Sequence, residues 1–226
     1  MQDLSSRITS HIKTSRTLHI MCQIPVFCWI TATVLDHMLT TDQRGELPKT
    51  LTDLYSHFLL VQTKRKKKKY DEGHETSPQE LMEADRKLLL KLGRLAFEHL
   101  EKGNIMFYQE DLEQCGSGCH RGLGEFLAAV YMFHCYTNSI TEVLEDLLGY
   151  NWRYIGSVLS LDFFLRKAME KSLKSKNGHL DLFVRFLLHG LSLESNQRLL
   201  GGLLGQTDNS PKIIQRAINN LQGDEQ

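Results

Sequence analysis

Three cysteines and two histidines in the central part of the chain have side chains that could bind a metal. Cys115, Cys119 and His120 lie within one short segment, and His134 and Cys135 follow further along the chain. Thiolate and imidazole groups are the usual protein ligands of zinc. The spacing C-x3-C-H matches no strong zinc template, however, and the two groups fall in different predicted local structures. We therefore expect no metal site.

Nucleotide hydrolysis requires a phosphate-binding loop, and the sequence contains no recognisable one. The pattern G-x-x-x-x-G-K-[ST] does not occur, and the glycines of GGLLG at 201–205 lack both the lysine and a preceding strand. No serine, histidine and acid arrangement stands out either. The sequence therefore predicts that this chain is not an enzyme and that it holds no cofactor when it is alone.

Lys64–Lys69, with the sequence KRKKKK, is a basic run that could bind RNA. The segment DEGHETSPQE follows it and supplies acidic residues that balance its charge locally. The whole chain has 27 basic and 27 acidic residues, so no net field draws it toward nucleic acid. We interpret the run as a solvated loop between two helices and expect no nucleic-acid partner.

The uncharged window from Thr17 to Leu35 is nearly as long as a bilayer span. Its polar residues, among them His19 and Gln23, would have to lose their hydration in lipid, and Pro25 would remove a helical hydrogen bond at midspan. Proline is well placed in the first turn of a helix, where its missing N–H would have no partner. The window therefore predicts a buried helix from about Pro25 to Leu39 and no membrane span.

The composition indicates a globular protein of a reducing compartment. The chain has 226 residues, of which 41% are hydrophobic, and this is enough to form a core. Its five cysteines are an odd number and are scattered among apolar neighbours, and no cleavable signal precedes them. We expect a cytoplasmic protein without disulfides.

Most of the remaining sequence has the periodicity and the start signals of helices. The predicted starts are Thr50, Ser77–Pro78, Ser139 with Glu142, Ser160 and Ser210–Pro211. The helix after Pro78 should end near Leu100, and Asn177–Gly178 should close the helix after Ser160 with a left-handed turn. The one credible strand is 104–108, NIMFY. This order of elements is that of the first half of a winged helix, but no wing strands follow.

Several motifs together closely resemble the expanded NLR (NACHT and leucine-rich-repeat) immune receptors of bony fish. The segments that carry the resemblance are IPVFCWITATVLDHML at 24–39, LPKTLTDLYSHFLLVQTK at 47–64, LGRLAFEHLEKGNIMFYQEDLEQCG at 92–116, EFLAAVYMFHCY at 125–136 and NGHLDLFVRFLLHGLSLESNQRLLGGLL at 177–204. They cover most of the chain at matching separations. The resemblance implies a cytoplasmic protein of innate immunity.

The resemblance also implies a fold class and three domains. The fold should be mainly α, with a helical subdomain at 1–44, an incomplete winged helix with at most one or two short strands at 45–137, and a second helical subdomain at 138–226. Several tens of residues that build the wing in the family should be absent between Gly116 and Glu125. The Walker A and Walker B segments, the effector domain and the repeats of the family should also be absent from this chain.

Two residues inherit roles from the family through this resemblance. Pro25, in the motif IPVFCWI, takes the place of the proline that packs against the adenine of bound ADP or ATP. Counting back from Glu125 without a gap, the family's phosphate-contacting histidine falls on His120. The segment GCHRGLGEF around His120 departs from the family pattern, which has a wing strand and LSxQ there.

The implied function is that of a regulatory segment which couples the nucleotide state of an NLR receptor to the opening of the molecule. Its partners should be proteins, through receptor oligomerisation or adaptors. The alternative function is a free helical adaptor or decoy that binds full-length NLRs or other partners through apolar faces.

Overall fold

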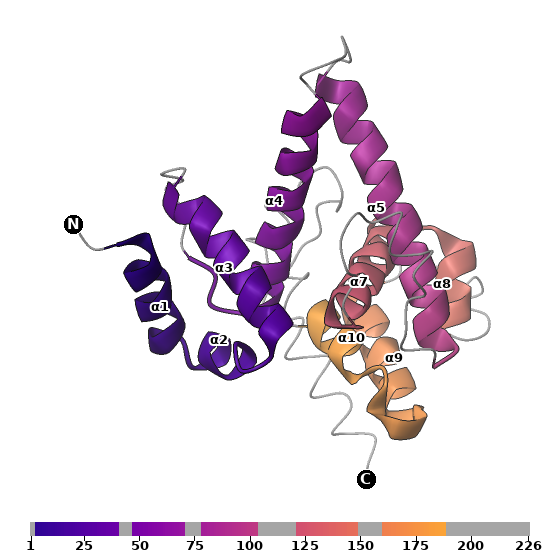
Figure 1. The fold of residues 1–226 in the computed structure, drawn as a ribbon. Coiled ribbons are helices and arrows are strands. Elements are labelled where there is room, and N and C mark those ends of the chain that lie inside the picture. Colours follow the sequence, from indigo (N-terminus) through magenta and orange to yellow (C-terminus); the bar gives the residue numbers. More distant parts are fainter. Residues whose placement is uncertain (1–2, 41–46, 71–77, 104–120, 149–159, 189–226) are drawn as a thin grey trace. The chain divides into compact units, whose positions relative to one another are not determined.

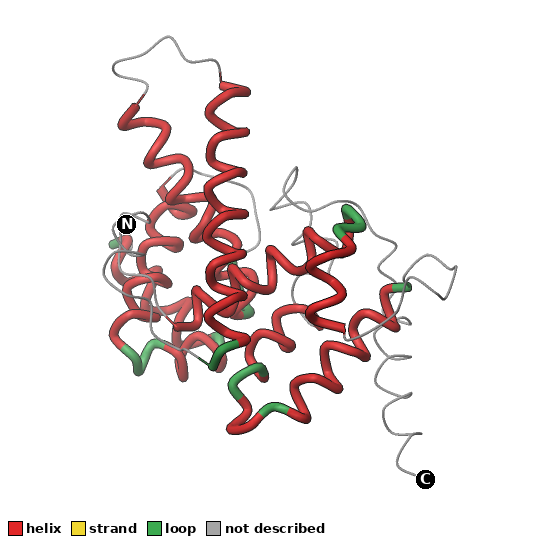
Figure 2. The backbone as a smooth tube through the Cα atoms, turned by 90° about the vertical axis from the view of Figure 1, so that its right-hand side faces the viewer, coloured by secondary structure: helices red, strands yellow, loops and turns green. Residues whose placement is uncertain are grey.

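The computed structural model describes residues 3–40, 47–70, 78–103, 121–148 and 160–188, and every regular element among them is helical (Figures 1 and 2). The prediction of a mainly α fold is therefore confirmed. The predicted strand at 104–108 and the helix start at Ser210 lie outside these ranges. The chain forms two compact units, Met1–Asp85 and Arg86–Gln226. Within the described ranges, none of the helices combines the length and the apolar character needed to cross a bilayer.

The first unit is built on the pairing of two of its helices. Its helices are α1 (Leu4–Thr14), α2 (Arg16–Met21), α3 (Pro25–Thr40) and α4 (Leu51–Tyr70). Helix α3 packs along α4 (Figure 1). The core residues that these two helices bury are Ile30, Val34, Leu35, Met38, Leu54, Tyr55, Phe58, Leu59 and Val61. The unit is therefore held together by apolar burial between helices rather than by a sheet.

Both helices of this pair begin where the sequence predicts. Helix α3 starts at Pro25, whose missing N–H costs nothing in the first turn. Ahead of α4, Thr50 and Asp53 cap each other's backbone. The Asp53 N–H donates to the Thr50 hydroxyl at 3.2 Å, and the Thr50 N–H donates to the Asp53 carboxylate at 3.3 Å. This reciprocal capping satisfies two donors that the start of a helix leaves without partners.

The basic run Lys64–Lys69 has a helical backbone, so the interpretation as a loop was wrong. Helix α4 continues without interruption through the run to Tyr70. Lysine and arginine are good helix formers, and the chain meets no glycine or proline before Gly73. Charge alone therefore did not indicate where the helix ends.

The second unit is arranged around one buried helix. Its helices are most of α5 (Pro78–Glu101), α7 (Arg121–Thr137), α8 (Thr141–Leu148), α9 (Leu161–Lys174) and α10 (Asp181–Phe186). Residues 122–135 of α7 are buried without exception. Such a helix has no solvent face, which agrees with the almost uniformly apolar sequence EFLAAVYMF. Helix α5 starts at Pro78 and ends at Glu101, in agreement with the prediction.

Helix α7 ends in a left-handed turn, and this corrects the role predicted for Ser139. Ser139 has φ +53°, its N–H donates to the Tyr136 carbonyl at 3.1 Å, and the Ile140 N–H donates to the Cys135 carbonyl at 2.9 Å. These two bonds make a Schellman motif that closes α7. Ser139 is therefore the residue that terminates α7, and it does not cap α8, which begins at Thr141.

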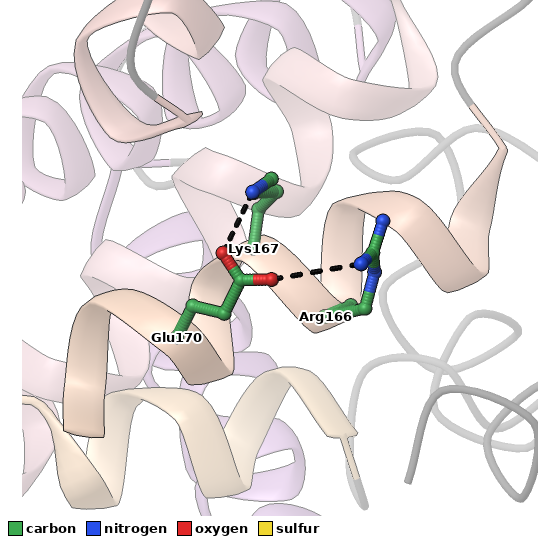
Figure 3. Close-up of polar contacts among 3 residues, drawn as sticks. All are labelled: Arg166, Lys167 and Glu170. Atoms are coloured by element: carbon green, nitrogen blue, oxygen red, sulfur yellow. Dashed lines mark hydrogen bonds and ion pairs between the residues drawn. The ribbon is translucent and has the colours of Figure 1, made fainter. Parts of the chain in front are cut away.

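Helix α9 starts as predicted but ends before the predicted left-handed turn. Ser160 is its N-cap residue, and the helix ends at Lys174, followed by Ser175 in an extended conformation. Asn177, at φ +64°, and Gly178, at φ +61°, lie in a separate 3-10 turn, Lys176–Gly178. On the surface of α9, the Glu170 carboxylate lies between two cations (Figure 3). It is 2.7 Å from the Lys167 ammonium and 3.8 Å from the Arg166 guanidinium. These partly exposed pairs add modestly to the stability of the helix.

Candidate functional site

The structure places one of the two predicted site residues. Pro25 is exposed at the first position of α3, directly after the turn that joins α2 to α3. His120 lies outside the described residues. The candidate site is therefore the α2–α3 turn, which we define as residues 20–29.

Two aromatic contacts fix the first turns of α3 against α4. The Phe27 ring lies 6.2 Å from the Tyr55 ring, and the Trp29 ring meets the Phe58 ring edge-on at 5.5 Å. Tyr55 and Phe58 are buried in the core. Aromatic pairs of this kind stabilise a packing arrangement beyond their buried area. Pro25 is thus carried by a helix end that is held in place at two points.

The α2–α3 turn presents apolar side chains to solvent. Ile20 is 54% exposed, Ile24 is 50% exposed and Trp29 is 47% exposed. Pro25 is exposed beside them in the sequence, and the turn contains no charged residue. A surface of this kind can contact a flat ring or an apolar side chain, but it offers no cation to a phosphate group. The turn therefore offers apolar contact area and no charge.

Sequence reasoning singled out neither of the two free cysteines of this turn. Cys22 is partly exposed and Cys28 is exposed. Burial raises the pKa of the Cys22 thiol. The spacing C-x5-C belongs to no recognised motif, so no pattern in the sequence marks these two residues.

The second unit contains no comparable site among the residues that the structure describes. No three metal-binding side chains gather there closely enough to hold an ion. The Asn138 amide lies 3.0 Å from Nδ1 of His134, and burial raises the pKa of Cys135 to about 11. His134 and Cys135 are both buried in α7 and contribute to its packing. Cys115 and Cys119, the other predicted zinc candidates, lie outside the described ranges.

Comparison with known proteins relates the chain to one family. Residues 87–116 match the family described as the NOD2 winged helix domain, and residues 120–225 match the family described as the NLRC4 helical domain HD2. These two regions of the chain are homologous to the winged-helix and helical domains of NLR proteins. No catalytic core is among the matched families.

The NLR relatives are much longer than this chain. "Protein NLRC3" of Mus musculus is 28% identical over 239 positions, which include 91% of this chain and 22% of that protein. "Protein NLRC5" of Ictalurus punctatus is 29% identical over 171 positions, which include 62% of this chain and 10% of that protein. "NACHT, LRR and PYD domains-containing protein 9" of Bos taurus is 32% identical over 116 positions, with 51% of this chain and 11% of that protein. The chain thus spans about a fifth of the first of these relatives.

In the longer alignments, the NLR relatives have residues at positions where this chain has a gap. We call these unfilled positions. For the mouse protein, 91% of 226 residues is about 206, so about 33 of the 239 positions have no residue of this chain. For the catfish protein, 62% is about 140 residues, which leaves about 31 of 171 positions. For the cattle protein, 51% is about 115 residues of 116 positions, so almost none are unfilled. The unfilled positions therefore belong to the two alignments that extend over 62% and 91% of the chain, and not to the one that covers 51%.

Proposed function

We propose that this chain is a regulatory segment of a cytoplasmic NLR receptor of innate immunity, of the bony-fish type. In that role it couples the nucleotide state of the receptor to opening of the molecule. The observation that carries the proposal is the succession, on one chain, of matches to an NLR winged helix and to an NLR helical domain. The chain carries no phosphate-binding loop, so the nucleotide must be held by another part of the receptor.

Pro25 is the residue through which the segment would sense the nucleotide. The family resemblance gives it the contact with adenine, and its exposure at the end of a fixed helix supports this role. The apolar, uncharged turn suits the face of a base rather than a triphosphate. By the same resemblance, His120 is the proposed phosphate contact of the winged helix.

The domain limits proposed for the segment are 1–44, 45–137 and 138–226. We further propose that the missing wing lies at the junction of residues 116 and 120, where one family match ends and the next begins. The roughly thirty unfilled positions of the longer alignments support a loss of this size. The match to the helical domain HD2 begins at residue 120, whereas the second helical subdomain is predicted to begin at residue 138. The limit at 138 stays a prediction.

The test uses a chimera in which this chain replaces the matching region of mouse NLRC3. The measurement is the amount of ADP or ATP that remains bound after purification, determined by chromatography of the released nucleotide. Pro25→Ala should lower the retained nucleotide several-fold. Pro78→Ala is the matched control, because Pro78 also occupies the first position of a helix but lies outside the turn.

Two results would count against the proposed role of Pro25. One is equal nucleotide retention by the two proline variants, because the effect would then be that of any first-turn proline. The other is full retention by the Pro25→Ala chimera. A chimera that retains no nucleotide even with Pro25 intact would count against the coupling role of the whole segment.

A second candidate function is that of a helical adaptor or decoy that binds full-length NLRs. The exposed Ile20, Ile24 and Trp29 favour it, since they offer an apolar contact surface. Replacing all three by serine should abolish co-purification with an intact NLR. Leu173→Ser is the control, because Leu173 is an apolar residue that is 78% exposed on α9, a helix of the second unit. Monomeric behaviour of the wild-type chain, without co-purification, would exclude this candidate.

A further inference from the structure

The turn between α9 and α10 contains an asparagine followed by a glycine, both in a left-handed backbone conformation. Asn177 has φ +64° and Gly178 has φ +61°, and both lie in the 3-10 turn Lys176–Gly178. Asn177 is exposed to solvent. Glycine adopts such angles freely, and asparagine adopts them more readily than most other residues. The backbone of the turn therefore favours these two residue types in this order.

A contact with α10 also favours glycine at position 178. A Cβ atom built on Gly178 would lie 2.7 Å from Oδ2 of Asp181. The other oxygen of this carboxylate, Oδ1, accepts a hydrogen bond of 2.8 Å from the Ser172 hydroxyl. A larger residue at position 178 would have to displace the carboxylate and adopt a strained φ. The fold thus places a residue without a side chain directly after an exposed asparagine.

An asparagine followed by a glycine can react with the backbone of its neighbour. The Gly178 nitrogen can attack Cγ of Asn177, because the two groups belong to adjacent residues and no side chain shields the nitrogen. The resulting five-membered ring closes only when Cβ of Asn177 and the Gly178 nitrogen are eclipsed about the Cα–C bond. The Asn177 ψ of 16° must therefore change first, so the reaction requires a brief opening of the turn.

The turn between α9 and α10 should open at little cost. It consists of three residues, none of which is buried. It is also bordered by an exposed hydrogen bond, in which Nδ1 of His179 donates to the Lys176 carbonyl at 2.9 Å. Short 3-10 turns have poorer hydrogen-bond geometry than α-helices, and exposed segments with few buried contacts open locally most often.

Asn138 provides a comparison within the same unit, because it is exposed but held in place. Its side-chain nitrogen donates to the His134 carbonyl at 2.9 Å and lies 3.0 Å from Nδ1 of the same residue. The backbone N–H that follows it, on Ser139, donates to the Tyr136 carbonyl at 3.1 Å. In the part of the chain that the structure describes, no such bond holds the Asn177 amide.

We propose that Asn177–Gly178 is a site of spontaneous deamidation and isomerisation. In the first step the Gly178 nitrogen attacks Cγ of Asn177, a C–N bond forms, and the side-chain amide group leaves with the Gly178 proton as ammonia. A succinimide remains. In the second step water opens this ring at either carbonyl group and gives aspartate or isoaspartate. The balance is one water consumed and one ammonia released, so the reaction needs no oxidant, reductant or enzyme.

Isoaspartate at position 177 would change the connection between two packed helices. The backbone then runs through the former side chain, which lengthens the turn by one methylene group, and a new carboxylate appears near Asp181. Because α10 packs on both α7 and α9, the altered turn should weaken the second unit. This inference does not rest on the proposed receptor function, and its test involves no nucleotide.

The test follows the conversion of Asn177 by peptide mapping. The folded chain is aged at body temperature and neutral pH in water labelled with heavy oxygen, and it is then digested with trypsin in ordinary water. Cleavage after Lys176 and Arg185 releases the peptide NGHLDLFVR. We expect this peptide to gain one heavy oxygen, and part of it to become a substrate for an isoaspartyl methyltransferase. Asn138 should gain the label many-fold more slowly.

Two variants complete the test. Asn177→Gln should leave the peptide without label, because ring closure by glutamine is much slower. Its melting temperature should not fall on ageing, whereas that of the wild type should. Ser172→Ala should gain the label faster than the wild type, because it releases the Asp181 carboxylate and loosens the turn.

The proposal is overturned if Asn177 and Asn138 gain the label at the same rate in the folded chain. It is also overturned if the Asn177 peptide gains the label only after unfolding in urea, because the native turn then does not open enough to react. An unchanged rate in the Ser172→Ala variant would contradict the opening step.

Discussion

Cys135 lies in the interior of α7, where its thiol is shielded from water. Burial raises the pKa of this thiol from its ordinary value of 9.0 to about 11, because the interior disfavours the thiolate. The interaction with Tyr131 and the charge of Arg94 lower the pKa of Cys135 again, but burial is the larger effect.

This pKa shift predicts a loss of stability at alkaline pH. Between pH 9 and about pH 11 the unfolded thiol releases its proton while the folded thiol keeps it, so the unfolded state binds fewer protons. The free energy of unfolding should therefore be unaffected below pH 9 and fall across this window, by at most about 1.4 kcal/mol per pH unit. Urea titrations of wild type and Cys135→Ala should show the extra slope in the wild type alone.

Cys28→Ala serves as the control, because it removes a cysteine that lies at the surface instead of the interior of α7. Other groups, including Tyr131, also titrate in this range, and burial raises the Tyr131 pKa to about 12. The prediction therefore concerns the difference between the Cys135 variant and the wild type. Identical pH slopes in these two proteins would contradict it.

Gly93 is the residue that permits close packing of α5 on α7. A Cβ atom built at this position would lie 2.7 Å from the Leu127 carbonyl oxygen and 2.7 Å from Cβ of Tyr131. One of these neighbours is backbone of a fully buried helix and cannot move aside cheaply. Gly93→Ala should therefore lower the free energy of unfolding by about 1 to 3 kcal/mol, despite the better helix propensity of alanine.

The control for Gly93→Ala is Lys91→Ala, because Lys91 is exposed on the same helix. This surface substitution should change stability by less than about 0.5 kcal/mol. Chemical denaturation of the two variants measures the difference. A Gly93→Ala protein as stable as the wild type would mean that the two helices separate without cost.

At the scale of the element, the turn after α7 stores a small strain. Ser139 adopts φ +53°, a region that disfavours any residue with a Cβ atom. Ser139→Gly should relieve this strain and raise the free energy of unfolding by about 0.5 to 1 kcal/mol. Thermal melting measures the gain. Ser160→Gly is the matched control, because Ser160 precedes α9 with φ −71° and gains nothing from glycine.

The helices show what local sequence can and cannot predict. The starts at Pro25 and Pro78 were predicted correctly, because first-turn proline acts through its own backbone and needs no partner. Ser139 was assigned to the wrong helix, because a serine between two helices can either terminate the first or cap the second. Only the backbone angle of Ser139, which depends on how α7 and α8 pack, decides between the two.

The candidate site was predictable only in part, for a similar reason. The position of Pro25 follows from the helix that it starts. The exposure of Ile20 and Ile24 depends on the angle at which α2 and α3 join, and no residue pattern encodes that angle directly. The exposure of Trp29 was equally hidden, since its segment is among the most apolar of the chain and its neighbour Ile30 is buried.

At the scale of the whole molecule, the isolated chain should not retain nucleotide. If Pro25 and its neighbours contact only the adenine, roughly ten heavy atoms at about 0.3 kcal/mol each give about 3 kcal/mol, which corresponds to a dissociation constant in the millimolar range or weaker. Micromolar ATP with magnesium should therefore leave the melting temperature unchanged. A clear shift at that concentration would show that the chain has phosphate-binding groups that its sequence does not reveal.

The three residues Asn138–Ile140 are all that separates α7 from α8, and the two helices pack on each other. Contacts between neighbours so close along the chain form with little loss of loop entropy. We therefore expect this hairpin to organise early when the protein folds, and its amides to be among the slowest to exchange with deuterium. The helix that becomes most deeply buried would then also be the one around which the rest of its unit assembles.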